Sequence, residues 1–278
     1  MSKKFFITAT LKILFIILLI HVISLFTFDK WIEYKKVSFH SAKISTKMNG
    51  YSIAFISDVH YMSASDLKNI VQELSQQKVN LLVLGGDFPV SMEEPQKTME
   101  ILSQIVTTDG IYGVEGNHDR YQKLFAAMKR YSIQPLSNSG VRIREKFYLA
   151  GVEDLWNRQP NIEQAIAEAE TGDFVLLIAH NPDVSMMQNT TGVDLILSGH
   201  THGGQITLFG LWAPALKIKS PYYITRYGQR FMSGWAKSRD GTPVYVSKGV
   251  GTFFQIPRVF ARPQVVLFTL MTDEVVPQ

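Results

Sequence analysis

Potential metal ligands follow five apolar stretches of this sequence, each where a buried strand would end. The first three stretches run into SDVH, GGD and GNHD, and the last two run into AHN and GHTH. These segments hold Asp58, His60, Asp87, Asn117, His118, Asp119, His180, His200 and His202. Each motif alone is more typical of a turn or a satisfied core group. Together they hold five of the seven histidines of the chain, and this combination predicts a metal site.

The composition limits the chemistry of that site. The 278-residue chain contains no cysteine, so thiolates are excluded and any metal must be bound through oxygen and nitrogen. Carboxylate and amide oxygens mixed with imidazole favour Mn²⁺, Fe or Zn²⁺ over Ca²⁺, which prefers oxygen ligands throughout. The net charge of +4 is small and the lysines are scattered, so we expect no nucleic acid as a partner.

Strands and helices must alternate to bring these side chains together. The apolar run 51–57 precedes an amphipathic helix with Ser65 as its expected N-cap and with apolar residues at i, i+3, i+4 and i+7. Further strands are expected at 80–86, 111–116, 174–180 and 194–200, and further helices after Pro95, at 120–131 and near 161–170. Parallel strands present their carboxyl ends at one end of a sheet, so the polar groups should converge in one crevice.

The first 36 residues differ from the rest of the chain. Residues 13–28 are almost wholly apolar, and extension back to Phe5 gives about the 20 residues that a membrane crossing requires. A core helix would carry a polar face, and a cleaved signal peptide would need a small-residue cleavage site, which does not follow Phe28. We therefore predict a membrane anchor and short tether at 1–36 and a catalytic domain at 37–278.

The orientation of this anchor in the cell membrane depends on the lysines beside it. Those on the amino side nearly balance those on the carboxyl side, so the positive-inside rule separates the two orientations poorly. We expect a single-pass protein whose catalytic domain lies on the extracytoplasmic side.

The ordered motifs D-x-H, G-D, G-N-H-D, H and G-H-T-H resemble the calcineurin-like metallophosphoesterase superfamily, over residues 58–202. The segment GHTHGGQ after a membrane anchor, with the tail SKGVGTFFQIPRVFARPQVVLFTL, resembles the membrane-associated bacterial branch, which includes enzymes that cleave UDP-2,3-diacylglucosamine. The resemblance implies a mixed α/β fold. This would be a four-layer αββα sandwich of two mixed β-sheets flanked by helices, here preceded by one transmembrane helix.

The same resemblance implies a dinuclear centre that holds two divalent metal ions, Mn²⁺ or else Fe or Zn²⁺. One ion would be bound by Asp58, His60 and His202 and the other by Asn117, His180 and His200, with Asp87 bridging them. A hydroxide that bridges the metals would attack a phosphodiester, pyrophosphate or phosphomonoester directly. His118 would protonate the leaving oxygen or stabilise the developing charge, and Asp119 would orient the His118 ring.

Substrate recognition is the part that the motifs define least. Arg258 and Arg262 are candidates to bind a phosphate, although surface arginines without a role are equally common. The aromatic-rich segment 207–228 is interpreted either as core packing with a solvated loop or as a wall that accepts an apolar substrate. We expect a phosphorylated small molecule or a lipid-linked substrate. The alternatives are a nuclease or nucleotide phosphodiesterase on the same metal core, and a non-catalytic scaffold that retains the fold.

Overall fold

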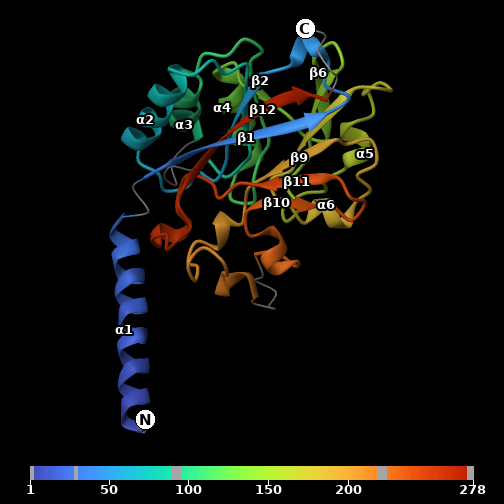
Figure 1. Ribbon diagram of the computed structural model, residues 1–278. Coiled ribbons are helices and arrows are strands. Elements are labelled where there is room, and N and C mark those ends of the chain that lie inside the picture. Colours follow the sequence, from blue (N-terminus) through green and yellow to red (C-terminus); the bar gives the residue numbers. More distant parts are fainter. Residues whose placement is uncertain (1–2, 28–30, 89–94, 218–223, 274–278) are drawn as a thin grey trace.

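Two six-stranded mixed sheets stack face to face and carry helices on both outer faces (Figure 1). The computed structural model describes residues 3–27, 31–88, 95–217 and 224–273. The first sheet has the order β1 (Glu33–Ser41), β12 (Gln264–Thr272), β2 (Tyr51–Ile56), β3 (Leu81–Leu84), β4 (Ile111–Gly113), β5 (Gln134–Pro135). The second has the order β10 (Gly234–Lys237), β11 (Pro243–Val246), β9 (Leu195–Ser198), β8 (Phe174–Ile178), β7 (Phe147–Gly151), β6 (Ser139–Arg144). The predicted αββα sandwich is confirmed.

The strands that carry the motifs run parallel within each sheet. β2, β3 and β4 pair in parallel in the first sheet, as do β8 and β9 in the second. Antiparallel pairs join β12 to β2, β6 to β7 and β10 to β11, which makes both sheets mixed. The parallel strands therefore end together, and the loops that leave them hold the predicted ligands.

Three apolar layers hold the sandwich together. In β2, Ile53 and Phe55 pack between the sheets, whereas Ala54 and Ile56 face the helices. Because successive side chains alternate between the two faces of a strand, a strand segment covered on both faces must be apolar, as the buried residues 53–56 of β2 are. Helices α2 (Ala64–Ser75), α3 (Pro95–Leu102) and α4 (Tyr121–Arg130) cover the first sheet, and α5 (Ile162–Ala165) and α6 (Val184–Met187) the second.

The predicted amphipathic helix is confirmed with a different beginning. Leu67, Ile70, Val71 and Leu74 form the buried face of α2. The N-cap is Ser63 rather than Ser65, because the Ser63 hydroxyl accepts a hydrogen bond from the Asp66 amide at 3.1 Å. The helix expected near 161–170 is also shorter, since α5 ends at Ala165 and the following residues form turns.

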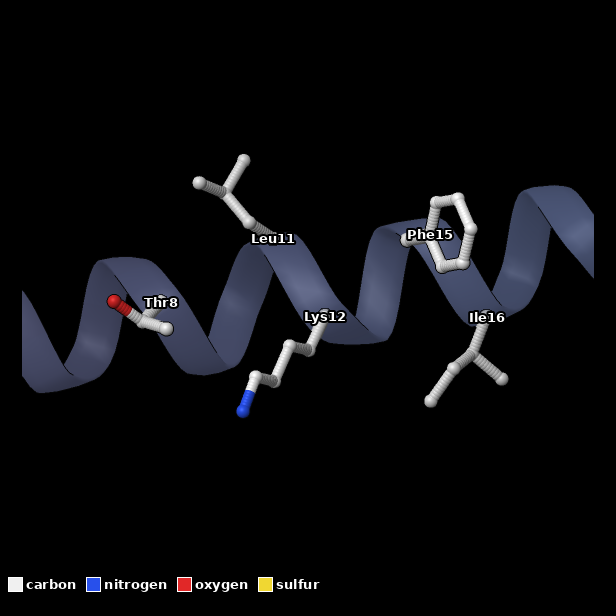
Figure 2. A pocket seen from close by; sticks show the side chains of 5 residues that line it. All are labelled: Thr8, Leu11, Lys12, Phe15 and Ile16. Atoms are coloured by element: carbon white, nitrogen blue, oxygen red, sulfur yellow. The ribbon is translucent and has the colours of Figure 1, made fainter.

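Helix α1 (Lys3–Thr27) projects away from the sandwich (Figure 1). Its segment Phe6–Ser24 is long and apolar enough to cross a membrane, and most of its large apolar side chains are exposed. The five side chains in Figure 2 line a pocket and all come from α1, so this pocket belongs to the exposed helix surface. A helix that is apolar and exposed favours single-pass membrane anchoring.

The connection from α1 to the sandwich is shorter than predicted. Strand β1 begins at Glu33, so the residues from Glu33 to Lys36 are part of the first sheet rather than of a tether. Their pairing with β12 adds backbone hydrogen bonds that the sequence does not reveal, because alternation in EYKKVSFHS is weak.

Candidate metal centre

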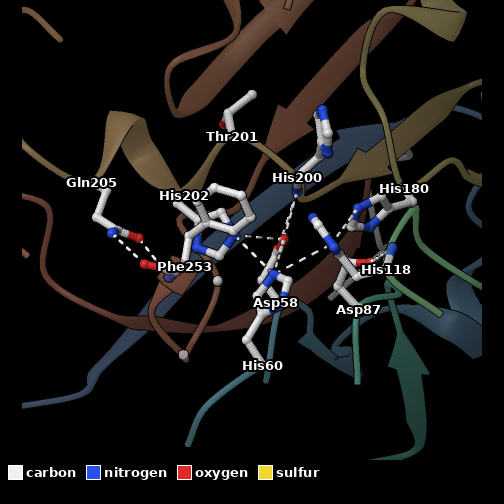
Figure 3. A network of polar contacts seen from close by, with 12 residues as sticks. Asp58, His60, Asp87, His118, His180, His200, Thr201, His202, Gln205 and Phe253 are labelled. Carbon is white, nitrogen blue, oxygen red and sulfur yellow. Dashed lines mark hydrogen bonds and ion pairs between the residues drawn. The ribbon is translucent and has the colours of Figure 1, made fainter. Parts of the chain in front are cut away.

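Two groups of buried side chains face each other at the carboxyl ends of the parallel strands (Figure 3). The first group is Asp58, His60 and His202, and the second is Asp87, His180 and His200. Within each group the potential ligand atoms all lie within 4.8 Å of one another. Every member is at most 6% exposed, so neither group is a chance cluster on the surface.

The distances within the first group fit a shared cation. His60 Nε2 lies 3.1 Å from His202 Nε2, which in turn lies 3.4 Å from Asp58 Oδ1. Two nitrogen ligands about 2.1 Å from one ion, at an angle near 90°, would be about 3.0 Å apart. The donor set of one carboxylate and two imidazoles therefore suits a divalent transition metal.

Asp87 lies between the two groups. Its Oδ2 atom is 3.3 Å from His60 Nε2 and 3.2 Å from His180 Nε2. Asn117 joins the second group, because its Oδ1 atom lies 3.2 Å from His180 Nε2. One carboxylate oxygen thus faces ligands of both groups, which is the geometry that a bridging ligand requires.

The loops that present these ligands adopt strained backbone conformations. Asp58, His60, Asp87, His200 and His202 have φ angles of 57°, 38°, 61°, 71° and 52°. A side chain with positive φ costs about 1–3 kcal/mol, and such residues concentrate where function requires them. Two of these loops are braced by their neighbours. The His200 amide donates to Asp58 Oδ1 at 3.0 Å, and the His118 amide donates to Asp87 Oδ1 at 2.8 Å.

Two glycines allow the ligands to approach the backbone. A Cβ atom at Gly199 would lie 2.3 Å from Asp58 Oδ2, and one at Gly116 would lie 2.3 Å from Asp87 Oδ1. These positions exclude any larger residue, because both contacts are far inside van der Waals distance. The glycines of GNHD and GHTH are therefore required because a side chain at either position would collide with a ligand carboxylate, and not only because they form turns.

Hydrogen bonds to backbone carbonyl oxygens orient the two imidazole rings of the second group. His180 Nδ1 lies 2.7 Å from the Gly85 carbonyl, and His200 Nε2 lies 2.8 Å from the Ile224 carbonyl. A ring N–H that donates to a carbonyl leaves the other nitrogen to bind a metal. Burial, followed by the charge on His180, lowers the pKa of His200 to about 3, so this ring is neutral at physiological pH.

The similarity of this sequence to known proteins agrees with the geometry of the site. Residues 51–204 match the calcineurin-like phosphoesterase family, which covers more than half of the chain. The chain belongs to this family. Its members use a dinuclear divalent metal centre, and the two groups of buried side chains are candidate ligands for such a centre. The phosphoesterase is therefore a metal-dependent phosphoric ester hydrolase.

Several relatives share most of this phosphoesterase. The uncharacterized metallophosphoesterase YkuE of Bacillus subtilis is 28% identical over 86% of this chain and 85% of its own. Phosphodiesterase YaeI of Escherichia coli is 28% identical over 80% and 82%. A zebrafish protein named transmembrane protein with metallophosphoesterase domain is 28% identical over 80% of this chain and 54% of its own.

His118 lies at the open side of the phosphoesterase site. Its ring centroid is 5.3 Å from that of His60 and 5.3 Å from that of Phe253, and its side chain is exposed. The other histidines of the site are buried, which leaves His118 the imidazole most accessible to a substrate among those described. Its position is compatible with contact to a leaving group.

Asp119 has a different neighbourhood from the one predicted. Its Oδ2 atom accepts the amides of Asp87 and Gly116 at 2.7 and 2.8 Å, and its Oδ1 atom accepts the Phe88 amide at 2.9 Å. These contacts assign Asp119 to holding the Asp87 loop against the Asn117 loop, instead of orienting the His118 ring. Burial, followed by the Asp87 charge, raises the pKa of Asp119 to about 7, whereas the amides oppose that rise.

The structure gives Arg258 a role other than the predicted phosphate contact. The side chain is 0% exposed. Its guanidinium donates to the carbonyl oxygens of His202, Lys248, Gly249, Gly251 and Ala261. Irregular loops leave such carbonyls without partners, and a buried arginine supplies enough donors to satisfy them. Arg258 therefore fixes the loop of His202.

Arg262 also lies elsewhere than predicted. Its guanidinium donates to the carbonyl oxygens of Trp31 and Ile32, just before β1. The side chain thus connects the end of the anchor segment to the sandwich, away from a role in phosphate binding.

Two aromatic residues that sequence reasoning missed border the metal centre. Trp156, 44% exposed, packs edge-on against His200 with ring centroids 4.7 Å apart. The Phe253 ring centroid lies 6.0 Å from the ring centroids of both His60 and His202. Neither belongs to a ligand motif, so only the loop conformations could have placed them. They form apolar walls on two sides of the site.

Proposed function

We propose that this phosphoesterase hydrolyses a phosphodiester or pyrophosphate bond in a membrane- or envelope-related substrate, with two Mn²⁺ ions in its centre. The observation that carries the proposal is Asp87 Oδ2, which faces ligands of both groups. Asp58, His60 and His202 would hold one ion, and Asn117, His180 and His200 the other. Bound ions of this kind would acidify a water and neutralise charge on a phosphoryl group.

His118 is proposed as the residue that serves the leaving group. Its exposed ring, 5.3 Å from the His60 ring, borders both the metal centre and solvent. From there it would donate a proton to the departing oxygen. Asp119 would keep Asp87 in place through the backbone.

Hydrolysis of model esters tests the proposed reaction. We expect the Mn²⁺-loaded full chain in detergent to hydrolyse bis(p-nitrophenyl) phosphate faster than p-nitrophenyl phosphate. The reverse preference would indicate a monoesterase. Hydrolysis of neither, with two equivalents of metal bound, would support the scaffold alternative. Cleavage of single-stranded DNA or RNA at a comparable rate would support a nuclease.

The side of the membrane is a separate proposal, in which the catalytic domain is extracytoplasmic. The absence of cysteine makes a simple test possible, because one introduced thiol is unique in the chain. Val106, 79% exposed, is a suitable site for Val106→Cys. We expect a membrane-impermeant maleimide to label it in intact cells. Labelling only after lysis would place the domain in the cytoplasm.

A further inference from the structure

The metal centre and the anchor helix lie at the same end of the sandwich. Strand β1 begins at Glu33 beside Gln264, where β12 also begins. Since β12 is antiparallel to β2 and Val266 pairs with Phe55, that end is also where β2 leads into the first metal ligands. Figure 1 shows α1 on the side of the sandwich where β1 begins, so the anchor helix and the metal centre share one end of the domain.

Exposed apolar side chains gather on two loops at this end. Gln205 ties the loops together, because its Nε2 atom donates to the carbonyls of Phe253 and Ile256 at 3.0 Å each. A backbone bridge between Ile206 and Val259 adds a second connection. We define the apolar rim as the exposed residues Ile206, Leu208, Phe209, Leu211, Phe254 and Ile256.

The apolar rim adjoins the last turns of α1. The His21 ring lies 4.8 Å from the Phe209 ring and 5.0 Å from the Phe260 ring, between centroids. The Phe260 amide donates to Ser24 Oγ at 3.1 Å. Ser24 ends the apolar window of α1, and His21 lies about 9 Å along the helix axis from Thr27. The loops thus reach alongside the helix to the depth of a membrane interface.

We propose that the apolar rim inserts into the interfacial layer of the membrane that α1 spans and holds the metal centre against the lipid surface. A solvated loop would not expose Leu211 to 82% and Phe254 to 62% next to a lipid-spanning helix. We assign the lipid surface as the partner of the rim because the rim is continuous with α1 and lies level with the end of its apolar segment. Beside the rim, Lys217 Nζ lies 5.5 Å from the centre of the Trp212 ring, and Trp and Lys are residue types that anchor proteins at membrane interfaces.

The rim also borders the entrance to the site. Phe253 and Phe254 are neighbours, with ring centroids 4.2 Å apart. Phe253 packs over the metal ligands, whereas Phe254 belongs to the rim. A phosphate at the lipid surface would therefore approach the centre along the aromatic side chains without crossing bulk water.

Spin labels on single introduced cysteines test the proposal in the full chain. We would label Leu211→Cys and Phe254→Cys, with Val106→Cys as the matched control at the opposite end of the sandwich. The protein would be reconstituted in phosphatidylcholine and phosphatidylglycerol liposomes. We expect labels at 211 and 254 to collide more with oxygen than with a water-soluble nickel complex, and the label at 106 to show the reverse.

Two outcomes would overturn the proposal. Nickel accessibility at 211 and 254 equal to that at 106 would place the rim in water. Shielding from both reagents, with dipolar broadening between labels, would show that a second copy covers it.

A second variant tests whether the rim acts as a unit. In the background Leu208→Asp with Leu211→Asp, we expect the label at 254 to gain nickel accessibility by at least about tenfold, because the rim loses two apolar side chains that would enter the lipid. Val106→Asp is the control background and should change nothing. Turnover of soluble bis(p-nitrophenyl) phosphate should be unchanged in both and reports folding. The label readout needs no turnover, so a failure of the proposed reaction would not obscure it.

Discussion

The two ends of the stacked sheets satisfy their polar groups in opposite ways. At the metal end, buried carboxylates and imidazoles face each other across 3.1–3.4 Å, on loops with positive φ. At the opposite end, Asp109 accepts two hydrogen bonds from Arg144, at 2.7 and 3.1 Å, and one from the Tyr51 hydroxyl. The opposite end is complete within the chain, whereas the metal end is arranged for cations that the chain does not supply.

This difference separates the end of the fold that serves function from the end that serves stability. The strained ligand loops lower the stability of the metal-free fold. Bound ions would raise it again, because a ligand that binds the native state stabilises that state. The network at Asp109 needs no ion, so substitutions there should affect stability alone.

The largest effect is expected from the bridging position. Asp87→Asn removes the charge of the oxygen that faces both ligand groups. We expect loss of both ions and turnover reduced to background. Metal content by mass spectrometry of the purified variant is the measurement, with Asp109→Asn as the control that should keep two ions. Two ions bound to Asp87→Asn would contradict the bridging role.

A smaller effect is expected from the exposed histidine. His118→Asn should keep both ions, because His118 lies outside both ligand groups. Turnover should fall by about 10²- to 10⁴-fold, the usual contribution of a general acid. The loss should be larger for alkyl phosphodiesters than for p-nitrophenyl esters, whose leaving group needs no proton. An equal loss on both substrates would exclude protonation of the leaving oxygen.

Metal affinity should depend on pH at the metal end. Burial lowers the pKa of His180, but the Asp87 and Asp58 carboxylates outweigh it and raise that pKa well above its usual range. Metal-free His180 therefore holds a proton that a metal must displace. Below that pKa, we expect apparent Mn²⁺ affinity to rise about tenfold per pH unit for each proton released.

Calorimetric titration of the metal-free protein with Mn²⁺ would measure this dependence. Buffers with different ionisation enthalpies would count the protons released. Binding without proton release between about pH 6 and pH 8 would show that His180 is already neutral.

The smallest effect on activity is expected at the opposite end. Asp109→Asn weakens the pairing with Arg144 and the hydrogen bond from Tyr51. The free energy of unfolding should fall by about 1 kcal/mol, since Arg144 is partly exposed and solvent screens the pair. Urea denaturation measures the loss, and turnover should be unchanged. A lower turnover at full metal content would show that the two ends are coupled.

Local pattern predicted the elements better than it predicted their boundaries. The spacing of Leu67, Ile70, Val71 and Leu74 predicted the buried face of α2, because helical periodicity needs no knowledge of the partner. The choice of Ser63 over Ser65 as the N-cap was not predictable in this way. Both are serines near the helix start, and only the backbone conformation decides which hydroxyl accepts the amide.

Side-chain direction separates the predicted site residues that converge from those that lie elsewhere. Asp58, His60 and His202 converge as expected, because they follow strands whose ends must meet. Arg258 and Arg262 are arginines in an irregular loop, where nothing in the local sequence distinguishes a solvent-facing guanidinium from a buried one. Asp119 was predicted to orient the ring of its sequence neighbour His118, but its carboxylate accepts a hydrogen bond from a loop about 31 residues away.

The amino-acid sequence is sufficient to predict the ligand types, their order along the chain, the alternation of strands and helices, and the apolar amino-terminal helix. Each of these follows from local chemistry or from periodicity. The folded chain was needed to show that one oxygen of Asp87 faces both groups, that Arg258 is buried, and that the apolar rim adjoins α1. These are relations between segments distant in sequence, and packing of the whole chain sets them.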